Sequence, residues 1–330
     1  MHNKTARLAL CAMLFALCVS AEAQQTGKIF RIGFLDSSTA SGAAVLVDAF
    51  RQELSKLGWN EGKNIAIEYR FAEHKTERLP ELAAELVRFK VNLIVVTETP
   101  VALAAKSATA FIPVVMTNVG DPVAAGLVAS LSHPGGNVTG FSSLTAELGT
   151  KRLEVLKDAV PKLTRVGVLR IPGGASGAQE RQLKELRDAA VALKLRLEQI
   201  ETQFDAKGFE SAFQTAKQKR VGAIMTIAAR RYFAERKRIV ELATKYRLPA
   251  IYFQKEFVDE GGLMSYGADF SDLYRKAAHY VDKILKGTKP ADLPVQQAMK
   301  FEFVVSLKAA KEIGLTLSPE FLSRANRVIK

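Results

Sequence analysis

Three short apolar runs follow one another in the first half of the chain, at residues 93–96, 113–116 and 138–141. None of them alternates between apolar and polar residues, which is typical of strands that helices cover on both faces, as in a parallel sheet. Each run stops at small polar residues. Because ligands bind beyond the carboxyl ends of the strands in such sheets, these polar stops are where we expect a binding site.

The pattern predicts the same alternation of strands and helices on either side of these runs. A first strand at 28–35 ends at Asp36, Ser37 and Ser38, and a helix with one apolar stripe follows it. From residue 148 onward a second series of strand–helix units begins. Its predicted strands are 165–169, 196–200, 223–227, 250–253 and 263–266, with a last strand at 301–305. Two such series predict an α/β fold with two doubly wound, parallel-sheet lobes.

The N-terminus has the three parts of a secretory signal peptide. Lys4 and Arg7 precede an apolar run at 8–19, and small residues on either side of Glu22 supply a cleavage site before Gln24. A transmembrane anchor is the competing interpretation, but about 12 apolar residues are too few to span a bilayer. We therefore expect residues 1–23 to be a signal peptide and the mature protein to lie in the periplasm.

The positions of the cysteines and of the charged residues exclude several classes of function. Both cysteines, Cys11 and Cys18, lie inside this N-terminal segment, so disulfides and thiol catalysis are excluded for a mature chain. The formal net charge of +13 raises the question of nucleic acid. The basic residues are spread along the 330-residue chain beside acidic ones, which favours solvated helix faces and no nucleic-acid partner.

Motifs for catalysis, metals and nucleotides are missing from the sequence. The four histidines have no ligand spacing, and no serine elbow, phosphate loop or dinucleotide loop occurs. We therefore expect no metal, no cofactor and no enzymatic activity. The glycine cluster at 173–177 could hold an anion or could be a flexible loop, and both interpretations stay open.

The polar stops supply the candidate ligand-binding groups. Glu98 and Asp121 are carboxylates that would suit an ammonium group, although either could instead cap a helix or lie in solvent. Hydroxyl groups at the same sheet edge would suit a carboxylate. They belong to Ser37, Ser38, Thr99 and Thr117. Tyr252 and Tyr266 end strands of the second series, where they could enclose an apolar group or simply pack in the core.

Several stretches together resemble the periplasmic substrate-binding proteins of ABC transporters, in the tryptophan/tyrosine-type family. The matching stretches are 57–64 with 67–70, 99–100, 120–123, 126–131 with 134–140, 261–267, and 280–287 with 293–295. The resemblance implies a type I periplasmic-binding fold, in which a hinge of three crossover strands joins two lobes and the ligand binds in the cleft between them. It places Thr99-Pro100, Asp121 and Tyr266-Gly267 on cleft-facing segments. Ser37, Ser38, Thr117 and Asn118 are placed at the cleft from their position in the pattern alone.

The resemblance also implies how the chain is divided and what it does. One lobe would comprise residues 28–141 plus about 268–296, and the other residues 142–267 plus about 297–330. The chain would bind a small polar or amphipathic solute, such as an amino acid, and deliver it as a monomer to ABC permease subunits. The alternatives are a periplasmic two-lobed enzyme or a ligand-sensing domain. The family usually has a glycine where this chain has Glu98, and that change puts an aromatic amino acid in doubt.

Overall fold

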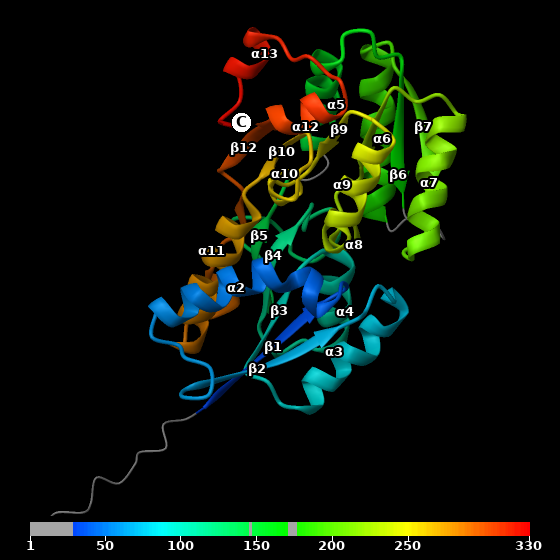
Figure 1. Cartoon of the computed structure of the whole chain (residues 1–330). Coiled ribbons are helices and arrows are strands. Elements are labelled where there is room, and N and C mark those ends of the chain that lie inside the picture. The colour runs from blue at the N-terminus through cyan, green and yellow to red at the C-terminus, as the bar shows by residue number, and fades with distance from the viewer. Residues whose placement is uncertain (1–28, 145–146, 171–176) are drawn as a thin grey trace, which may run out of the picture.

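The computed structural model describes residues 29–144, 147–170 and 177–330. The predicted signal peptide and most of the glycine cluster at 173–177 lie outside these residues. The chain forms two stacked lobes, each a sheet with helices on both faces (Figure 1). This is the architecture expected of a type I periplasmic-binding fold, and the prediction of an α/β protein with two parallel-sheet lobes is confirmed.

The first sheet consists of six strands in the order β11-β5-β4-β3-β1-β2, and all its pairs are parallel. Its strands are β1 (Phe30–Asp36), β2 (Ile65–Phe71), β3 (Leu93–Val96), β4 (Val114–Val119), β5 (Val138–Ser142) and β11 (Gln296–Gln297). The helices around it are α2 (Ala40–Lys56), α3 (Leu79–Arg88), α4 (Thr99–Ala108) and α11 (Phe270–Leu285), with the 3-10 turns η1 (Thr76–Arg78) and η2 (Pro290–Asp292).

Successive residues of β3 show why this strand is apolar throughout. Val95 packs in the core that α2 and α11 cover, whereas Ile94 and Val96 pack in the core under α3 and α4. Side chains of a strand point alternately to opposite faces of the sheet, so both faces of β3 are buried. A continuous apolar run is the sequence that such a position requires.

The second sheet consists of seven strands in the order β13-β12-β10-β9-β8-β6-β7. Its strands are β6 (Arg165–Arg170), β7 (Arg196–Glu201), β8 (Ala223–Thr226), β9 (Ala250–Tyr252), β10 (Met264–Ala268), β12 (Phe301–Ser306) and β13 (Arg327–Ile329). The pair β10–β12 is antiparallel and the others are parallel. The helices are α5 (Glu147–Ala159), α6 (Gly177–Ala192), α7 (Ala206–Gln218), α8 (Arg230–Ala234), α9 (Arg236–Lys245), α10 (Glu256–Asp259), α12 (Leu307–Glu312) and α13 (Pro319–Ser323).

The chain passes between the two sheets in three places, after β5, after β10 and after β11. These passages are hydrogen-bonded side by side. The amide of Ala298 donates to the carbonyl of Ser142 at 2.8 Å, and the amide of Asp269 donates to the carbonyl of Lys300 at 3.0 Å. The second passage delivers α11, which packs on α2 and β4 of the first lobe, as Figure 1 shows for the orange helix beside the blue one.

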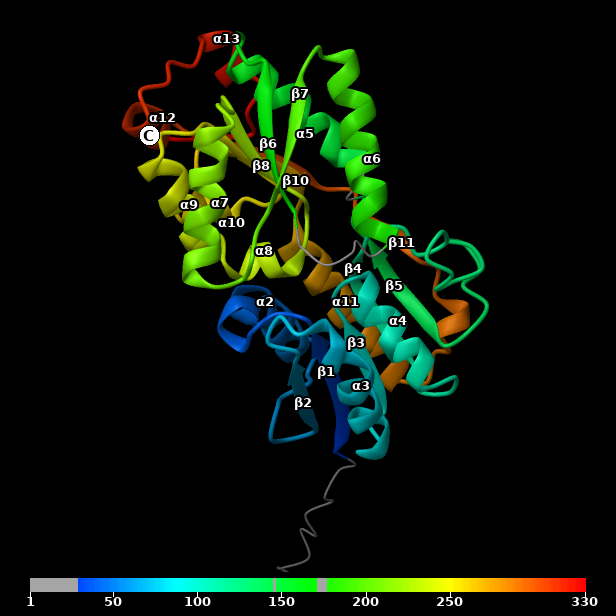
Figure 2. The ribbon, with the colours of Figure 1, turned by 90° about the vertical axis from the view of Figure 1, so that its right-hand side faces the viewer.

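Two helices of opposite lobes meet across the gap between the sheets. The short helix α8 lies over the start of α2 (Figure 2), and Gly42 of α2 is in van der Waals contact with Ala234. The apolar positions of residues 232–246 follow one helical stripe, which predicts a single helix, but the structure has α8 and α9 with a break at Glu235. Within the described residues, no helix is both long and apolar enough to cross a membrane.

Candidate ligand-binding site

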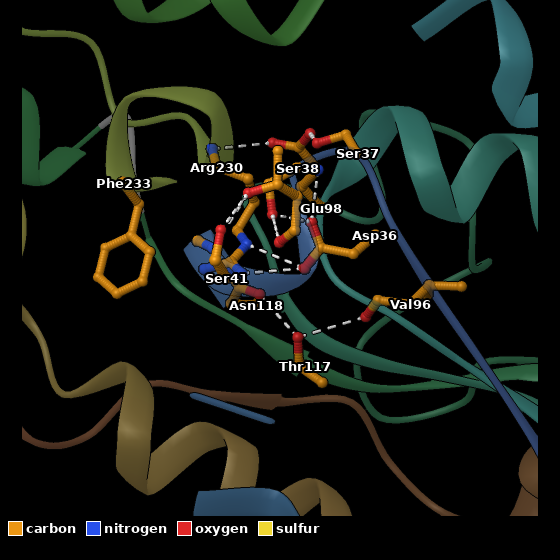
Figure 3. A network of polar contacts seen from close by, with 12 residues as sticks. Asp36, Ser37, Ser38, Ser41, Val96, Glu98, Thr117, Asn118, Arg230 and Phe233 are labelled. Atoms are coloured by element: carbon orange, nitrogen blue, oxygen red, sulfur yellow. Dashed lines mark hydrogen bonds and ion pairs between the residues drawn. The ribbon is translucent and has the colours of Figure 1, made fainter. Parts of the chain in front are cut away.

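The carboxyl ends of β1, β3 and β4 bring a set of polar side chains together. The Ser37 hydroxyl donates to Glu98 Oε1 at 2.5 Å, although the two residues are 61 positions apart. The Thr117 hydroxyl donates to Asn118 Oδ1 at 2.7 Å. Asp36, the last residue of β1, accepts from the amide and the hydroxyl of Ser38 at 2.8 and 2.7 Å (Figure 3).

Arg230 of the other lobe closes this network. It follows β8 at the start of α8, and its Nη2 and Nε both donate to Asp36 Oδ2, at 2.9 and 3.3 Å (Figure 3). Its backbone amide also donates to Glu98 Oε2 at 3.3 Å. Arg230 is 2% exposed and Asp36 is 0% exposed, so the two lobes share a fully buried ion pair.

Burial and charge act in opposite directions on Arg230. Burial alone lowers the pKa of its guanidinium, but the Asp36 carboxylate outweighs that effect and raises the pKa above the ordinary value. The guanidinium carbon also lies 5.0 Å from the ring centre of Phe233 and 6.0 Å from that of Tyr274. Cations are attracted to the faces of aromatic rings, which adds to the stability of the buried charge. Arg230 is therefore a fixed cation in the middle of the molecule.

Glu98 is an acidic group of the network whose charged form is disfavoured by burial. The residue as a whole is partly accessible, but its carboxyl end is deep enough that burial raises its pKa. The hydrogen bond from Ser37 opposes this rise, and the nearby Asp36 adds to it. Glu98 precedes α4 and makes no side-chain hydrogen bond to the start of that helix, so it is not a capping residue.

A second group of contacts joins the lobes at the edge of the network. Arg181 of α6 pairs with Asp121 beyond β4 at 2.7 Å. Arg231 donates to the backbone carbonyl of His74, and the His74 ring lies 3.7 Å from the Glu235 carboxylate. The structure is thus closed between the lobes both in the buried centre and at the rim.

The structure brings together many of the predicted site residues. Ser37, Ser38, Glu98, Thr117 and Asn118 form the network described above, from three different strand ends. Thr99 and Pro100 open α4 directly behind Glu98. Asp121 lies at the exposed rim, where it also accepts a hydrogen bond from the backbone amide of Ala124. The contact spans a turn at residues 122–126, where the sequence had left open a helix cap beside ligand contact.

The predicted residues of the second lobe are more scattered. Tyr252 is buried, stacks on Phe257 with ring centres 4.6 Å apart, and lies against Gly262 inside its own lobe. Tyr266 packs edge-on against Phe303. Gly267 permits a close approach, because an added Cβ would collide with the backbone carbonyl of Phe253.

Asp36 and Arg230 are the two residues of the network that are absent from the predicted set. Asp36 was recognised only as the end of a strand. The signal for Arg230 is the basic pair Arg230-Arg231, which begins three residues after the predicted strand 223–227 and was concealed by the general spread of charge. In the described part of the chain, no three or more His, Cys, Asp or Glu side chains form a group that could hold a metal ion.

Comparison with known proteins places this arrangement among transport receptors. A family model described as ABC transporter substrate binding protein matches residues 39–329. The chain is 28% identical over 266 residues to a tyrosine-binding protein of Clostridioides difficile (strain R20291), which covers 81% of this chain and 75% of the relative.

Two solved structures are similar over 92% of the chain but to different degrees. An ABC domain from Streptococcus pneumonia in complex with L-Trp is 26% identical, with a TM-score of 0.78 over 100% of its length. A ligand-free, open structure of a substrate-binding protein with adhesive properties from Clostridium difficile is 25% identical, with a TM-score of 0.62 over 99% of its length. With identity and coverage nearly equal, the present structure is closer to the L-Trp complex. The chain belongs to the family of ABC transporter substrate-binding proteins.

Proposed function

We propose that the chain captures a small amphipathic solute between its two lobes, with an aromatic amino acid as the leading candidate. The observation that carries this proposal is the meeting of strand ends from both sheets around the buried Asp36–Arg230 pair. Ligands of open α/β sheets bind at this edge. The named solutes of two relatives, tyrosine and L-Trp, support the choice of candidate.

The site residues belong to this proposal. Ser37, Ser38, Glu98, Thr117 and Asn118 would contact the solute from the first lobe, with Thr99 and Pro100 beside them. Tyr266 and Gly267 would face it from the second lobe, and Asp121 would close the rim. Tyr252 would contribute through the packing of β9 and Phe257 rather than by touching the solute, because its ring lies inside the second lobe.

We infer lobes of residues 28–141 plus about 268–296 and 142–267 plus about 297–330, supported by β11 pairing with β5 and α11 packing on α2. Closure would present one surface to permease subunits, with the receptor acting as a periplasmic monomer after removal of residues 1–23. The protein would bind and release the solute unchanged. A turnover assay tests that last statement, and product formation would contradict it.

Thermal unfolding of the mature protein against amino acids, aromatic acids, nucleosides and sugars tests the proposal. A ligand present at about 100 times its dissociation constant stabilises the folded state by about 2.7 kcal/mol, which raises the midpoint by several degrees. We expect such a shift with L-tyrosine or L-tryptophan, and mass spectrometry of denatured protein would show whether a solute copurifies. A shift with sugars or nucleosides alone would contradict an amino acid ligand, and no bound or binding solute of any class would contradict the receptor.

A further inference from the structure

The third nitrogen of Arg230 is a buried donor that Asp36 does not use. Nε and Nη2 form one edge of the planar guanidinium, and both donate to Asp36 Oδ2. Nη1 lies on the other side of the group and has no hydrogen-bond partner among the described residues. A buried charged donor without a partner is costly, so this nitrogen is suited to an acceptor that arrives from outside the protein.

Other polar groups at the strand ends of the second lobe share this property. The side-chain amide of Gln254 follows β9 and the hydroxyl of Thr226 ends β8, and neither has a partner in the described part of the chain. The Tyr274 hydroxyl of α11, whose ring lies beside the Arg230 guanidinium, is within reach of the Thr117 hydroxyl of the first lobe. All three residues are buried. Each of these groups can donate, which favours a ligand rich in acceptor oxygens.

The carboxylates of the network, in contrast, are already engaged with the protein. Asp36 receives two hydrogen bonds from Ser38 on Oδ1 and two from Arg230 on Oδ2. These contacts fill the acceptor capacity of both oxygens. Glu98 receives Ser37 on one oxygen and the Arg230 amide on the other. A positive group on a ligand therefore finds both carboxylates of the network occupied, and only neutral acceptors such as Gln254 Oε1 remain for it.

Building on the proposed function, we propose that the solute is an organic acid whose carboxylate binds Nη1 of Arg230. Arg230 is then the residue that selects acids over amides and amines. The rings of Phe233 and Tyr274 hold the guanidinium in place for this contact, and Asp36 binds its other edge. An amino acid and its deaminated acid both carry the required carboxylate. Only the amino acid also carries an ammonium group, so comparing the two shows whether that group is needed.

The test compares matched ligands by isothermal titration calorimetry. The ligands are L-tyrosine, L-tyrosinamide, tyramine and 3-(4-hydroxyphenyl)propionate. For wild type we expect L-tyrosine to bind about tenfold to a hundredfold more tightly than L-tyrosinamide, because a hydrogen bond between charged groups replaces one to a neutral amide. We expect no binding of tyramine. Binding of the propionate would identify acids in general as the ligand class, and binding of L-tyrosine alone would identify amino acids.

The variant Arg230→Lys separates recognition from support of the fold. Lysine keeps a positive charge for Asp36 but has no third nitrogen and no planar fork. We expect the acid-to-amide ratio of affinities to fall toward one in Arg230→Lys. If Arg230 had a purely structural role, Arg230→Lys would weaken the binding of both ligands alike and leave the acid-to-amide ratio of affinities unchanged. The matched control is Arg231→Lys, at the neighbouring arginine that contacts the His74 carbonyl and the Phe204 ring, and it should keep the wild-type ratio.

Three results would overturn parts of the account, and they can be told apart. Equal binding of L-tyrosinamide and L-tyrosine by wild type would overturn the carboxylate contact and leave the solute receptor intact. So would an unchanged ratio in Arg230→Lys. Failure of every compound in the wider solute panel to bind wild type would instead overturn the proposed function itself. The comparison of ligands on wild type needs no variant, so the inference stays testable if Arg230→Lys does not fold.

Discussion

Asp36 and Asp121 both pair with an arginine of the other lobe, but the two pairs lie at different depths. The side chains of Asp36 and Arg230 are 0% and 1% exposed, whereas those of Asp121 and Arg181 are 46% and 35% exposed. Removing one partner of a buried pair leaves an uncompensated charge in the interior. An exposed pair is screened by water and contributes little.

We therefore expect Asp36→Asn to lower the free energy of unfolding by about 3–5 kcal/mol. Asp121→Asn, the matched control with the same change in charge and shape, should cost about 0–1 kcal/mol. Urea unfolding followed by circular dichroism measures both variants, with saturating L-tyrosine present to hold the lobes closed. Equal costs for the two variants would show that the Asp36–Arg230 pair is not buried in solution.

We expect Glu98 to make the folding stability depend on pH, because burial raises the pKa of its carboxyl group above 4.5. The folded protein then holds this proton more tightly than the unfolded chain does. The contribution of Glu98 to stability is full below pH 4.5 and is lost as the pH rises through the raised pKa of the folded state.

The variant Glu98→Gln has no titratable group at this position, so it does not lose this contribution as the pH rises. Its free energy of unfolding relative to wild type should therefore increase as the pH is raised from 4.5 to neutrality. Urea unfolding at a series of pH values measures the difference. The exposed Glu312 of α12 provides a control, and Glu312→Gln should show no such trend. A flat difference for Glu98→Gln would mean that the carboxyl group is solvated.

Helices α2 and α8 form the interface on which closure depends. Gly42 of α2 is in direct contact with Ala234 of α8, and an added Cβ would collide with Ala234. Both helices pack within their own lobes, so this contact exists only when the lobes are together. A side chain at Gly42 should oppose the closed form and leave each lobe folded.

We expect Gly42→Ala to destabilise the closed form by about 1–3 kcal/mol, the usual cost of overpacking. Because only the closed form binds tightly in this account, ligand affinity should fall by about fivefold to more than a hundredfold, with little change in circular dichroism. Gly120→Ala is the control, since nothing lies within 4 Å of a Cβ added there. Calorimetric titration with L-tyrosine measures both variants, and equal affinities would contradict the contact.

Strong periodic segments were predictable from sequence, and elements defined by distant partners were not. The run at β3 is apolar because two cores bury it, and that pattern is visible in any single sequence. The strands β11 and β13 have two and three residues, too few for a pattern, and exist because β5 and β12 offer them an edge. The break between α8 and α9 at Glu235 was missed because the apolar stripe continues across it.

The site residues of the first lobe were predictable from the sequence, and Arg230 of the second lobe was not. Ser37 and Glu98 lie beyond the neighbouring strands β1 and β3, and Thr117 lies near the end of the adjacent β4. The rule for strand ends was therefore enough to group them. The partner of Asp36 lies 194 residues away in the other lobe, at a position fixed only when the lobes close. Local patterns carry no information about that distance, and an arginine beyond a strand is ordinarily solvated.

The two lobes and three hydrogen-bonded passages make the whole molecule a candidate for hinge motion. A ligand shifts such an equilibrium only as far as it binds one form better than the other. The contacts of Asp36 with Arg230 and of Gly42 with Ala234 show that the lobes are together in the present form. Opening would separate Asp36 from Arg230 and expose both to water.

The distance between the lobes, with and without ligand, tests this account most directly. Both natural cysteines precede residue 24, so Glu81→Cys in α3 and Lys217→Cys in α7 would be unique sites for spin labels on exposed helices of opposite lobes. Pulsed electron paramagnetic resonance should give one short distance with saturating L-tyrosine and a longer, broader distribution after ligand removal. Asp36→Asn should move the ligand-free distribution further toward the long distance. An identical distance in all three samples would contradict a receptor that closes on its solute.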